Sequence, residues 1–541
     1  MTTAPVPTLV ADLDQLAFDN RFTAQLPGDP DTSGRRRQVE GALFSRVAPT
    51  PVAAPVTVAW SPEVAEQLGL DPALCRSADF AQVFAGNRVP AGADPFAACY
   101  GGHQFGSWAG QLGDGRAIAL GEVLDGAGRH QTLQLKGAGP TPYSRRADGR
   151  AVLRSSVREF LCSEAMHHLG IPTTRALSLV ATGDQVLRDV LYDGHPAPEP
   201  GSVVCRVAPS FTRFGSFQLP AARGDKDLLR QLVEFTLEAD FPHLARRGTF
   251  EEQLAAMFGE VCERTAELVV HWMRVGFVHG VLNTDNMSIL GLTIDYGPYG
   301  WLEGFDPAWT PNTTDAGTLR YRYGAQPQVA HWNLLQLANA MAPLTEDLGP
   351  LQQALDRYGT AYNDGFAAVT NERLGWGSPR DGDDALVGQL FSLLPRSEID
   401  QVLFFRDLAR VPVAPASELS DDALLAPLAE AWYQPEEMAG EVGEAMAAWL
   451  RAWGQRVVYG GLAENERRTR MDALNPRFVL RNYLAQEAID AAEQGDTTLL
   501  LELLEVLRHP YDEQPGRERF ARRRPEWARD RVGCSMLSCS S

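Results

Sequence analysis

A single stretch, from His279 to Gly297, limits what this chain can fold into more than any other. It reads His-Gly-Val-Leu-Asn-Thr-Asp-Asn-Met-Ser, passes through a short apolar turn, and continues as Ile-Asp-Tyr-Gly. Asn286 and Asp295 stand nine residues apart across that turn. Their side chains offer the hard oxygen ligands that Mg²⁺ prefers when phosphates and water complete its coordination. The stretch therefore predicts a metal site, and a solvated polar turn between two strands is the alternative interpretation.

The same stretch resembles the catalytic loop of protein kinases, which reads His-x-Asp followed by an Asn further along. His279 and Asn286 keep the kinase spacing, but Val281 takes the place of the catalytic Asp. A valine can neither accept a proton nor hold a hydroxyl group. Asp285 is the nearest carboxylate that is free to act as a substitute base. Asp295 then begins an Asp-Tyr-Gly sequence where kinases have Asp-Phe-Gly.

Lysine is nearly absent from the chain, since only two of its 49 basic residues are Lys. One of them, Lys136, ends an alternating, strand-like segment and precedes Gly-Ala-Gly, which resembles the kinase strand whose Lys reaches phosphate oxygens. A helix is expected from Ser155 to Leu169, and kinases pair a helix Glu with that Lys. Glu159 is the candidate partner and Glu164 the alternative. The third interpretation is that both carboxylates lie at the protein surface.

Two glycine-rich segments, 100–106 and 110–116, precede the Lys136 strand. Closely spaced Gly residues let the backbone approach a phosphate chain, and Arg116 offers a forked donor to it. Kinases place Gly-x-Gly-x-x-Gly over their phosphates, whereas the second segment here has the order Gly-x-x-Gly-x-Gly with Asp114 inside. A plain hairpin is the alternative.

A strand is expected to end near Arg206, and Arg213 follows seven residues later. Two guanidinium groups placed in this way match the geometry of a triphosphate, although most Arg side chains lie at a protein surface. From residue 225 the pattern becomes helical. Thr249 opens a capping box, Thr-Phe-Glu-Glu, and the apolar face that follows leads to His279. Asn475-Pro476 is expected to open a further helix that runs to Ala492.

Composition excludes several classes of partner. The chain has 49 basic and 69 acidic residues, and a formal charge of −20 repels nucleic acid and anionic membranes at long range. Its seven Cys form no CxxC pair, so a disulfide scaffold or a structural zinc site is not expected. No apolar run reaches the ~20 residues that span a bilayer, and the start of the chain does not resemble a signal peptide. We therefore expect a soluble cytoplasmic protein.

Further blocks of sequence occur in a fixed order along the chain. They are Gly102–Gly106 (GHQFG), Gly110–Arg116 (GQLGDGR), Leu135–Gly139 (LKGAG), Thr141–Arg145 (TPYSR), Asp148–Arg150 (DGR), Gly170–Ala176 (GIPTTRA), Arg206–Ser210 (RVAPS), His279-Gly280 and Asn283–Ser288 (NTDNMS). Together they closely resemble the selenoprotein O family. The resemblance runs from the Leu26-Pro27-Gly28-Asp29 region to the terminal Cys539-Ser540-Ser541, which is nearly the whole chain.

This resemblance implies an α+β, two-lobed pseudokinase fold that binds ATP in a flipped orientation. It implies transfer of AMP, rather than phosphate, to Ser, Thr or Tyr hydroxyls of proteins, with UMP transfer and self-modification as further activities. Asp285 would accept the proton, Glu159 would pair with Lys136, and Asn286 and Asp295 would hold Mg²⁺, or Mn²⁺ in its place. The nucleotide would be held by Gly113, Gly115, Arg116, Lys136, Asp148, Gly149, Arg206 and Arg213.

Some relatives also pair a terminal Cys with a Cys in the loop after the metal Asp. The corresponding terminal residue here is Cys539, but the chain has no Cys between 262 and 534, and Pro311 stands near the expected place. A redox switch of that kind is therefore not predicted from the sequence. Asp295 is expected to be an exposed carboxylate in a cleft, whose loss would leave the fold intact.

Four regions are expected: an N-terminal extension over 1–95, a nucleotide-binding lobe over 96–215, a helical lobe with the catalytic loop and the metal site over 216–515, and an Arg-rich tail over 516–541. Two other functions stay open at this point. One is an ordinary kinase that uses Asp285 as its base, and the other is an inactive nucleotide-binding scaffold.

Overall fold

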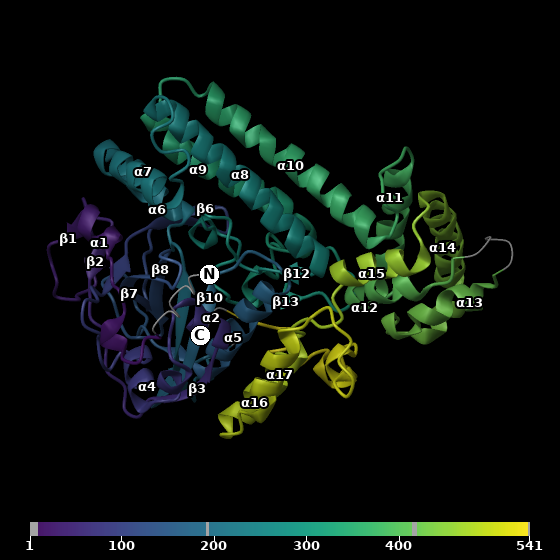
Figure 1. Ribbon diagram of the computed structural model, residues 1–541, viewed down its shortest axis with the longest axis horizontal. Helices are drawn as coiled ribbons and strands as arrows, with labels where there is room; N and C mark the ends of the chain where they lie inside the picture. Colours follow the sequence, from purple (N-terminus) through teal and green to yellow (C-terminus); the bar gives the residue numbers. More distant parts are fainter. Residues whose placement is uncertain (1–8, 191–193, 414–418, 539–541) are drawn as a thin grey trace, which may run out of the picture.

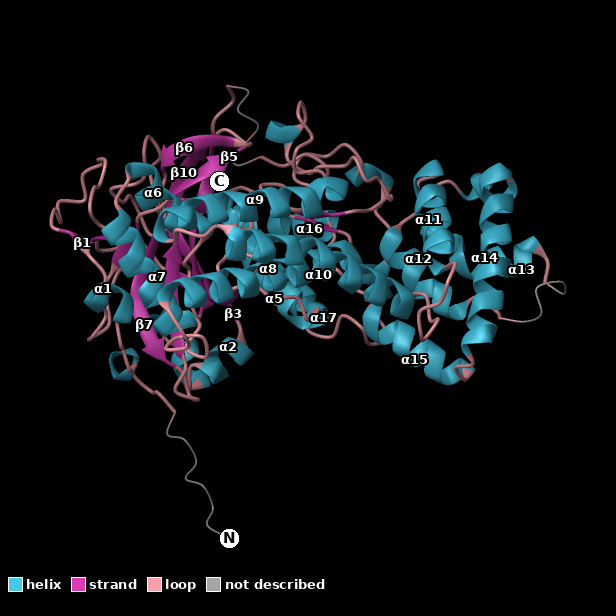
Figure 2. Ribbon diagram, turned by 90° about the horizontal axis from the view of Figure 1, so that it is seen from above, coloured by secondary structure: helices cyan, strands magenta, loops and turns pink. Residues whose placement is uncertain are grey.

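The structure is a computed structural model that describes residues 9–190, 194–413 and 419–538. Figures 1 and 2 show strands gathered at one end of the molecule and helices filling the remainder. This arrangement is the α+β fold with a strand-rich lobe followed by a mainly helical lobe that the sequence predicts. Cys539 lies outside the described residues.

Nine strands form the main sheet, in the order β1-β2-β4-β7-β8-β11-β10-β3, with β9 paired to β11 off this path. These strands are β1 (Gly28–Asp29), β2 (Phe44–Arg46), β3 (Val56–Trp60), β4 (Phe96–Ala98), β7 (Ala117–Leu124), β8 (His130–Lys136), β9 (Ala151–Val152), β10 (Arg175–Arg188) and β11 (Ala197–Ala208). Because β1 to β3 precede residue 95, the expected N-terminal extension shares one sheet with the expected nucleotide-binding lobe.

The two faces of β8 serve different purposes, because successive side chains of a strand point to opposite sides. Leu133 and Leu135 lie in a buried apolar cluster that includes Phe80 of helix α4 (Ala78–Phe84). Gln134 and Lys136 lie on the other face. In the antiparallel pairing with β11, Gln134 stands opposite Arg206. The alternation therefore gathers three polar side chains on one face of a sheet whose other face is core.

Helices make up most of the second lobe. In the first lobe the helices are α1 (Arg21–Gln25), α2 (Pro62–Gln67), α3 (Pro72–Cys75), α4, and α5 (Leu153–His168). The remaining helices are α6 (Phe214–Arg223), α7 (Lys226–Asp240), α8 (Phe250–Val275), α9 (Gln326–Met341), α10 (Gly349–Arg373), α11 (Asp383–Leu393), α12 (Gln401–Asp407), α13 (Asp421–Leu425), α14 (Glu441–Gly460), α15 (Glu464–Leu474), α16 (Asn482–Glu493) and α17 (Thr498–Leu507). The expected helix over 155–169 is α5, shifted by two residues at its start.

Helix α8 delivers the chain to the His279 loop. Its N-terminus has the predicted capping box, in which the Thr249 hydroxyl accepts from the Glu252 N–H and the Glu252 carboxylate accepts from the Thr249 N–H. Gly276, at a φ of 75°, ends the helix in the left-handed conformation that glycine favours. The short strand β12 (Phe277–Val278) follows and pairs with β13 (Gly300–Trp301), so the loop between them is tied at both ends.

The prediction of a helix that begins at Asn475-Pro476 is wrong, because α16 begins at Asn482. The backbone N–H groups of Arg477 and Phe478 both donate to the carbonyl of Pro510, which holds this segment out of helical geometry. Arg481 then forms a buried ion pair with Asp400 at 2.6 Å directly before the helix. Tertiary hydrogen bonds thus override the local helix-start signal.

The described part of the Arg-rich tail is docked rather than frayed. The N–H of Leu537 donates to the carbonyl of Pro311 at 3.0 Å, and the N–H of Thr313 donates to the carbonyl of Leu537 at 2.8 Å. The side chain of Asn312 in turn donates to the carbonyl of Gly280 at 3.0 Å. The tail is therefore connected through one loop to the stretch that begins at His279.

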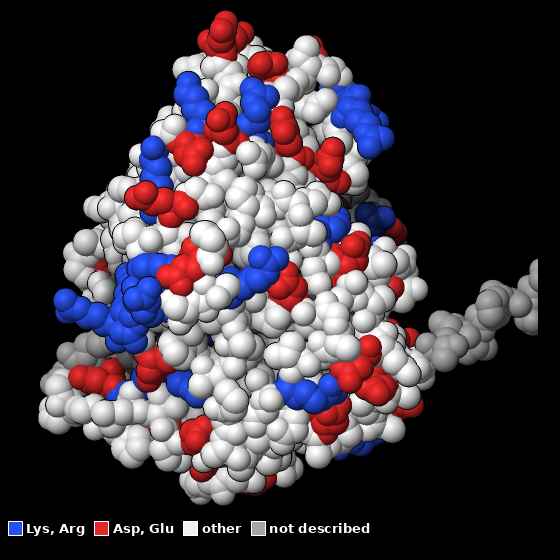
Figure 3. Space-filling model, turned by 90° about the vertical axis from the view of Figure 1, so that its left-hand side faces the viewer, with Lys and Arg blue, Asp and Glu red and all other residues white. Residues whose placement is uncertain are grey.

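The surface carries charges of both signs. On the face seen in Figure 3, acidic and basic side chains alternate, and one group of basic side chains gathers at an edge. Every helix within the described ranges is too short or too polar to cross a bilayer.

Candidate active site

A cavity of about 710 Å³ lies between the sheet and the His279 loop. Of the twelve residues that the sequence predicts for the site, ten line it: Gly113, Gly115, Arg116, Lys136, Asp148, Gly149, Arg206, Asp285, Asn286 and Asp295. Glu159 and Arg213 are the two that do not. They lie behind the wall, where each is bonded to residues that do line the cavity. The fold thus brings together residues that are up to 182 positions apart in the sequence, from Gly113 to Asp295.

Lys136 and Glu159 form an ion pair, with Nζ of the lysine 2.6 Å from Oε2 of the glutamate. Burial lowers the pKa of the Lys136 ammonium, and the adjacent Glu159 carboxylate opposes that shift. The other oxygen of Glu159 lies 3.3 Å from the guanidinium of Arg206. Glu164, the alternative partner, is instead bonded to Arg175 at 2.7 Å, so the structure places Glu159 and not Glu164 beside the lysine.

Asp295 lies between two guanidinium groups. Arg206 donates to its Oδ1 and Arg213 donates to its Oδ2. Burial alone would raise the pKa of this carboxyl, but Arg213 and Arg206 hold it well below its usual range. The backbone of Asp295 has a φ of 56°, in the left-handed region that few non-glycine residues adopt. The expectation of an exposed carboxylate without a structural role is therefore wrong, because Asp295 neutralises two buried cations.

Asp285 is 7% exposed and lies on the wall of the cavity. The side-chain amide of Gln104 donates to its Oδ2 at 3.1 Å, while its Oδ1 is buried with no hydrogen-bond partner among the described residues. Burial raises the pKa of this carboxyl to about 6. A Cβ at Gly102 would lie 2.7 Å from Oδ1, so only glycine fits there. The guanidinium of Arg213 also donates to the Asp285 backbone carbonyl at 2.8 Å.

Asn286 and Asp295 offer the predicted pair of hard oxygen ligands. The amide nitrogen of Asn286 donates to the carbonyl of Val281 at 2.8 Å, which leaves the amide oxygen for an external cation. A cation at Asp295 would compete with the two guanidinium groups that now bind this carboxylate. One carboxylate and one amide, completed by phosphate and water, are a donor set that suits Mg²⁺.

The glycine-rich segment and the Asp148 loop form the opposite rim. A Cβ at Gly113, whose φ is 78°, would lie 2.4 Å from the ring of Tyr143. A Cβ at Gly149, whose φ is 74°, would lie 2.2 Å from the backbone of Gly139. Both positions therefore require glycine. Asp148 forms a twofold ion pair with Arg188 at 2.8 Å, which fixes this rim to strand β10.

Sequence reasoning missed three side chains that shape the site, Gln104, Gln134 and Arg188. Gln134 accepts from Arg206 and lies two residues before Lys136 on the same strand face, so the alternation of β8 was a usable signal for it. Gln104 and Arg188 contact site residues that are distant in sequence, Asp285 and Asp148, so no local pattern identifies them.

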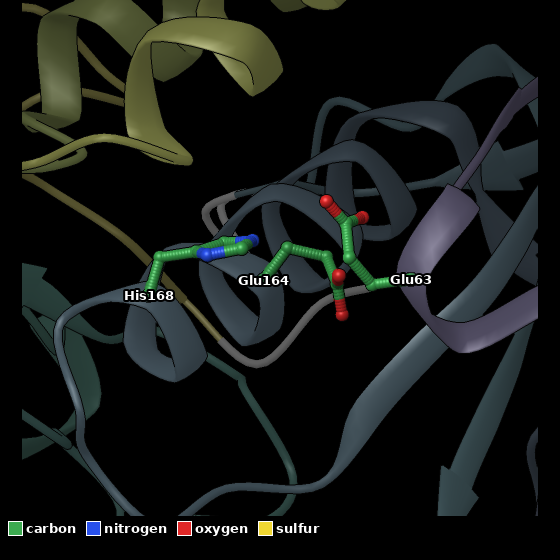
Figure 4. Close-up of side chains that lie close together, drawn as sticks. All are labelled: Glu63, Glu164 and His168. Atoms are coloured by element: carbon green, nitrogen blue, oxygen red, sulfur yellow. The ribbon is translucent and has the colours of Figure 1, made fainter. Parts of the chain in front are cut away.

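A second group of potential metal ligands lies outside the cavity. Figure 4 shows Glu63, Glu164 and His168 close together, and one ligand atom from each lies within 4.8 Å of the others. All four carboxylate oxygens already accept hydrogen bonds, from Arg508, Ser61, Arg175 and the Ala176 N–H. Ion pairs join Glu63 of α2 to Arg508, directly after α17, and Glu164 of α5 to Arg175 of β10, and we assign the group no metal.

The fold, with a Lys–Glu pair on one side of the cavity and an Asn–Asp pair on the other, defines a kinase-like nucleotide-dependent transferase. Val281 occupies the position that kinases give to their catalytic base.

Comparison with known proteins identifies the family within this class of transferases. A family model described as protein adenylyltransferase SelO matches residues 35–508. Aromatoleum aromaticum and Xanthomonas axonopodis pv. citri each have a protein named protein nucleotidyltransferase YdiU. Each is 60% identical to this chain over 98% of this chain and 100% of its own length. The protein of the same name in Rhodopirellula baltica is 59% identical over 97% of this chain and 99% of its own length. The chain belongs to the SelO family of protein nucleotidyltransferases, and both the resemblance stated from its motifs and the kinase-like fold are confirmed.

Proposed function

We propose that this chain moves AMP from ATP to the hydroxyl groups of Ser, Thr or Tyr side chains in proteins. The observation that carries the proposal is the relation between Val281 and Asp285. The position that a kinase gives to its base holds an apolar side chain, while a buried carboxylate lies four residues further along on the same cavity wall. An acceptor hydroxyl would therefore lose its proton at a different place from that in a kinase, which supports attack on a different phosphorus atom.

In this proposal the nucleotide is held by cations and by glycine backbone. Gly113, Gly115 and Gly149 leave the backbone bare where the phosphate chain would approach, and a Cβ at Gly113 or Gly149 would clash with Tyr143 or Gly139. Lys136, fixed by Glu159, supplies a compact ammonium, and Arg116 and Arg206 supply forked donors. Arg213 contributes from behind the wall through its bonds to Asp295 and Asp285, and Asp148 holds the rim together with Arg188.

These residues, the acceptor hydroxyl and ATP account for every bond, electron pair and proton of the transfer step. The oxygen of the acceptor hydroxyl attacks the α-phosphorus, the bond from that phosphorus to its bridging oxygen breaks, and pyrophosphate leaves with the electron pair. Asp285 takes the hydroxyl proton, and a carboxyl pKa of about 6 keeps it mostly ionised at neutral pH yet basic enough to act. Arg206 would stabilise the charge that develops on the pyrophosphate.

Asn286 and Asp295 would hold Mg²⁺, with Mn²⁺ as an alternative. A divalent cation at this position would neutralise part of the negative charge of the phosphates. The orientation of the Asn286 amide and the position of Asp295 on the cavity wall support the assignment.

We further propose UMP transfer from UTP and modification of the chain itself as secondary activities of the same cavity. The partners in this account are proteins that carry hydroxyl side chains, and a net charge of −20 argues against nucleic acid and anionic membranes. The six Cys residues described by the structure are free thiols, which supports a reducing, cytoplasmic location. We retain the division at residues 95, 215 and 515 as a proposal.

Two other functions compete with this one. A kinase that uses Asp285 as its base would add a phosphoryl group to protein, and a scaffold would add nothing. Intact-mass spectrometry of protein incubated with ATP and Mg²⁺ separates the three. The proposal expects the mass of an adenylyl group on the acceptor or on the chain itself, and a phosphoryl mass would establish the kinase instead.

A further inference from the structure

A hairpin beside the cavity is fixed to the catalytic loop. It consists of β5 (Gly101–Gln104) and β6 (Ser107–Gln111). The N–H of His103 donates to the hydroxyl of Thr284 at 2.7 Å, and the N–H of Phe105 donates to the hydroxyl of Tyr321 at 2.8 Å. With Gln104 bonded to Asp285, three successive residues of the hairpin are tied to the loop that carries the base and to the segment after it. The hairpin tip therefore has a fixed position next to Asp285.

The tip of this hairpin presents aromatic side chains to solvent. Phe105 is 38% exposed and Trp108 is 40% exposed, although large apolar side chains are usually buried. Phe105 also has a φ of 51°, and its backbone hydrogen bond to Tyr321 holds it in that uncommon conformation. Phe105 directly follows Gln104, which lines the cavity, so its exposed ring is a small, rigid apolar surface beside the site. Trp108 lies against His103, with 5.1 Å between the ring centroids, on the strand face opposite Gln104.

Unpaired positive charge lies on a loop that lines the same cavity. Arg145 and Arg146 are exposed and line the cavity, as Gln104 of the hairpin does. Within residues 9–190, 194–413 and 419–538, neither of these two guanidinium groups forms an ion pair or a hydrogen bond. The side chain of Arg36 donates to the carbonyl of Ala147 at 2.9 Å, which adds a third cation to this loop.

The position of these cations is unusual for this chain. The chain carries a net charge of −20, and the arginines at the bottom of the cavity are neutralised by Glu159 and Asp295. Positive charge that is left unpaired at a cavity mouth attracts an anionic partner and orients it. The exposed Phe105 ring and a pair of free guanidinium groups around one cavity fit an extended polypeptide that carries acidic and apolar side chains.

We propose that the entrance to this cavity, from Phe105 to Arg145 and Arg146, is the docking surface for the acceptor protein: acidic side chains of the acceptor pair with Arg145 and Arg146, and a neighbouring apolar side chain packs on Phe105. This inference rests on the proposed function and adds the class of acceptor to it, an acidic segment beside the modified hydroxyl. The hydrogen bonds from the hairpin to the catalytic loop would then place that hydroxyl beside Asp285.

ATP is also an anion, so the test must separate steering of the nucleotide from docking of the acceptor. The probes are short fluorescent peptides with one Tyr, identical except that the flanking residues are Asp, Ala or Lys. Binding to the full chain is measured by fluorescence anisotropy, and transfer is measured with α-labelled ATP. We expect the Asp-flanked peptide to bind and to be labelled about tenfold better than the Lys-flanked peptide.

The double variant Arg145→Glu/Arg146→Glu should raise the KM for the Asp-flanked peptide by about tenfold and remove the preference over the Lys-flanked peptide, with the KM for ATP changed by less than about twofold. Arg246 and Arg247 provide the matched control. They are also consecutive and exposed, the first also has a positive φ, and no ion pair joins them to the described residues. Arg246→Glu/Arg247→Glu makes the same change in net charge and should leave both KM values unchanged.

The apolar half of the surface is tested by Phe105→Ala, with Tyr459→Ala as a control because Tyr459 is exposed on α14 and does not line the cavity. Phe105→Ala should weaken peptide binding severalfold, and Tyr459→Ala should not.

Equal binding and labelling of the Asp-flanked and Lys-flanked peptides would overturn the docking proposal while leaving the transfer intact. A double variant that raised the KM for ATP alone would also overturn it. Absence of any α-label, on peptide or enzyme, would instead remove the proposed function, and the anisotropy measurement would still decide whether the entrance selects acidic peptides.

Discussion

The ammonium of Lys136 lies 2.6 Å from a carboxylate oxygen of Glu159, and both side chains are buried, with Lys136 on the cavity wall and Glu159 behind it. This pair joins strand β8 to helix α5. The chain has 47 arginines and only two lysines, and Arg206 already occupies the other side of Glu159, so we infer that position 136 needs a compact ammonium.

Lys136→Arg should therefore lower kcat/KM for transfer by about a hundredfold, because a planar guanidinium does not fit between Glu159 and the phosphate chain as an ammonium does. Steady-state kinetics with α-labelled ATP measures the effect. Lys226, the other lysine of the chain, is exposed at the start of α7 and provides the matched control. Wild-type rates in Lys136→Arg would show that the ammonium has no special role.

Asp295→Ala should abolish transfer and also destabilise the fold. Arg206 and Arg213, which are 2% and 1% exposed, would lose the carboxylate that neutralises them, and breaking a buried pair costs roughly 3–5 kcal/mol. Urea denaturation measures the loss in free energy of unfolding. Asp364→Ala, at an exposed position of α10, is the control and should unfold like the wild type. An equally stable Asp295→Ala protein would contradict the account of this carboxylate.

Asn286→Ala should raise the Mg²⁺ concentration needed for half-maximal transfer by about tenfold, because one of two protein ligands is lost. Titration of activity with Mg²⁺ after removal of metal by a chelator measures the shift. Stability should change little, since Asn286 is partly exposed and its side chain makes one hydrogen bond, to Val281. An unchanged Mg²⁺ requirement would remove Asn286 from the metal site.

Stability should depend on pH through Glu303, which lies away from the cavity. Burial raises the pKa of this carboxyl from 4.5 to about 7. A carboxyl whose pKa is raised on folding stabilises the folded state fully below the unfolded value, and that contribution is lost as the pH rises through the folded value. The shift corresponds to a loss of up to about 3 kcal/mol. The amide of the Glu303→Gln variant does not titrate, so its stability does not fall in this way. The Tm of the variant relative to that of the wild type should therefore rise between pH 5 and pH 8. A constant difference across that range would refute the burial argument.

Much of the site could be predicted from the sequence because its residues lie in short, ordered motifs. Spacing placed Asn286 and Asp295 together, and the alternation before Lys136 predicted its strand. The partners of Asp295 could not be predicted, because the two arginines that neutralise it come from strand β11 and the start of α6, far away in sequence. The same limit applies to Gln104, whose contact with Asp285 spans 181 residues. The start of α16 was mispredicted because hydrogen bonds to the Pro510 carbonyl hold the preceding segment out of helical geometry.

The most direct test of the account uses ATP labelled at either the α- or the γ-phosphorus, incubated with the full chain and Mg²⁺, with Asp285→Asn as the inactive control. If Asp285 is the base and the pyrophosphate is the leaving group, α-labelled ATP labels protein and γ-labelled ATP does not, and the control variant is unlabelled in both. Label from the γ-position would contradict adenylyl transfer and establish a kinase. No label from either position, with ATP binding intact, would leave a nucleotide-binding scaffold.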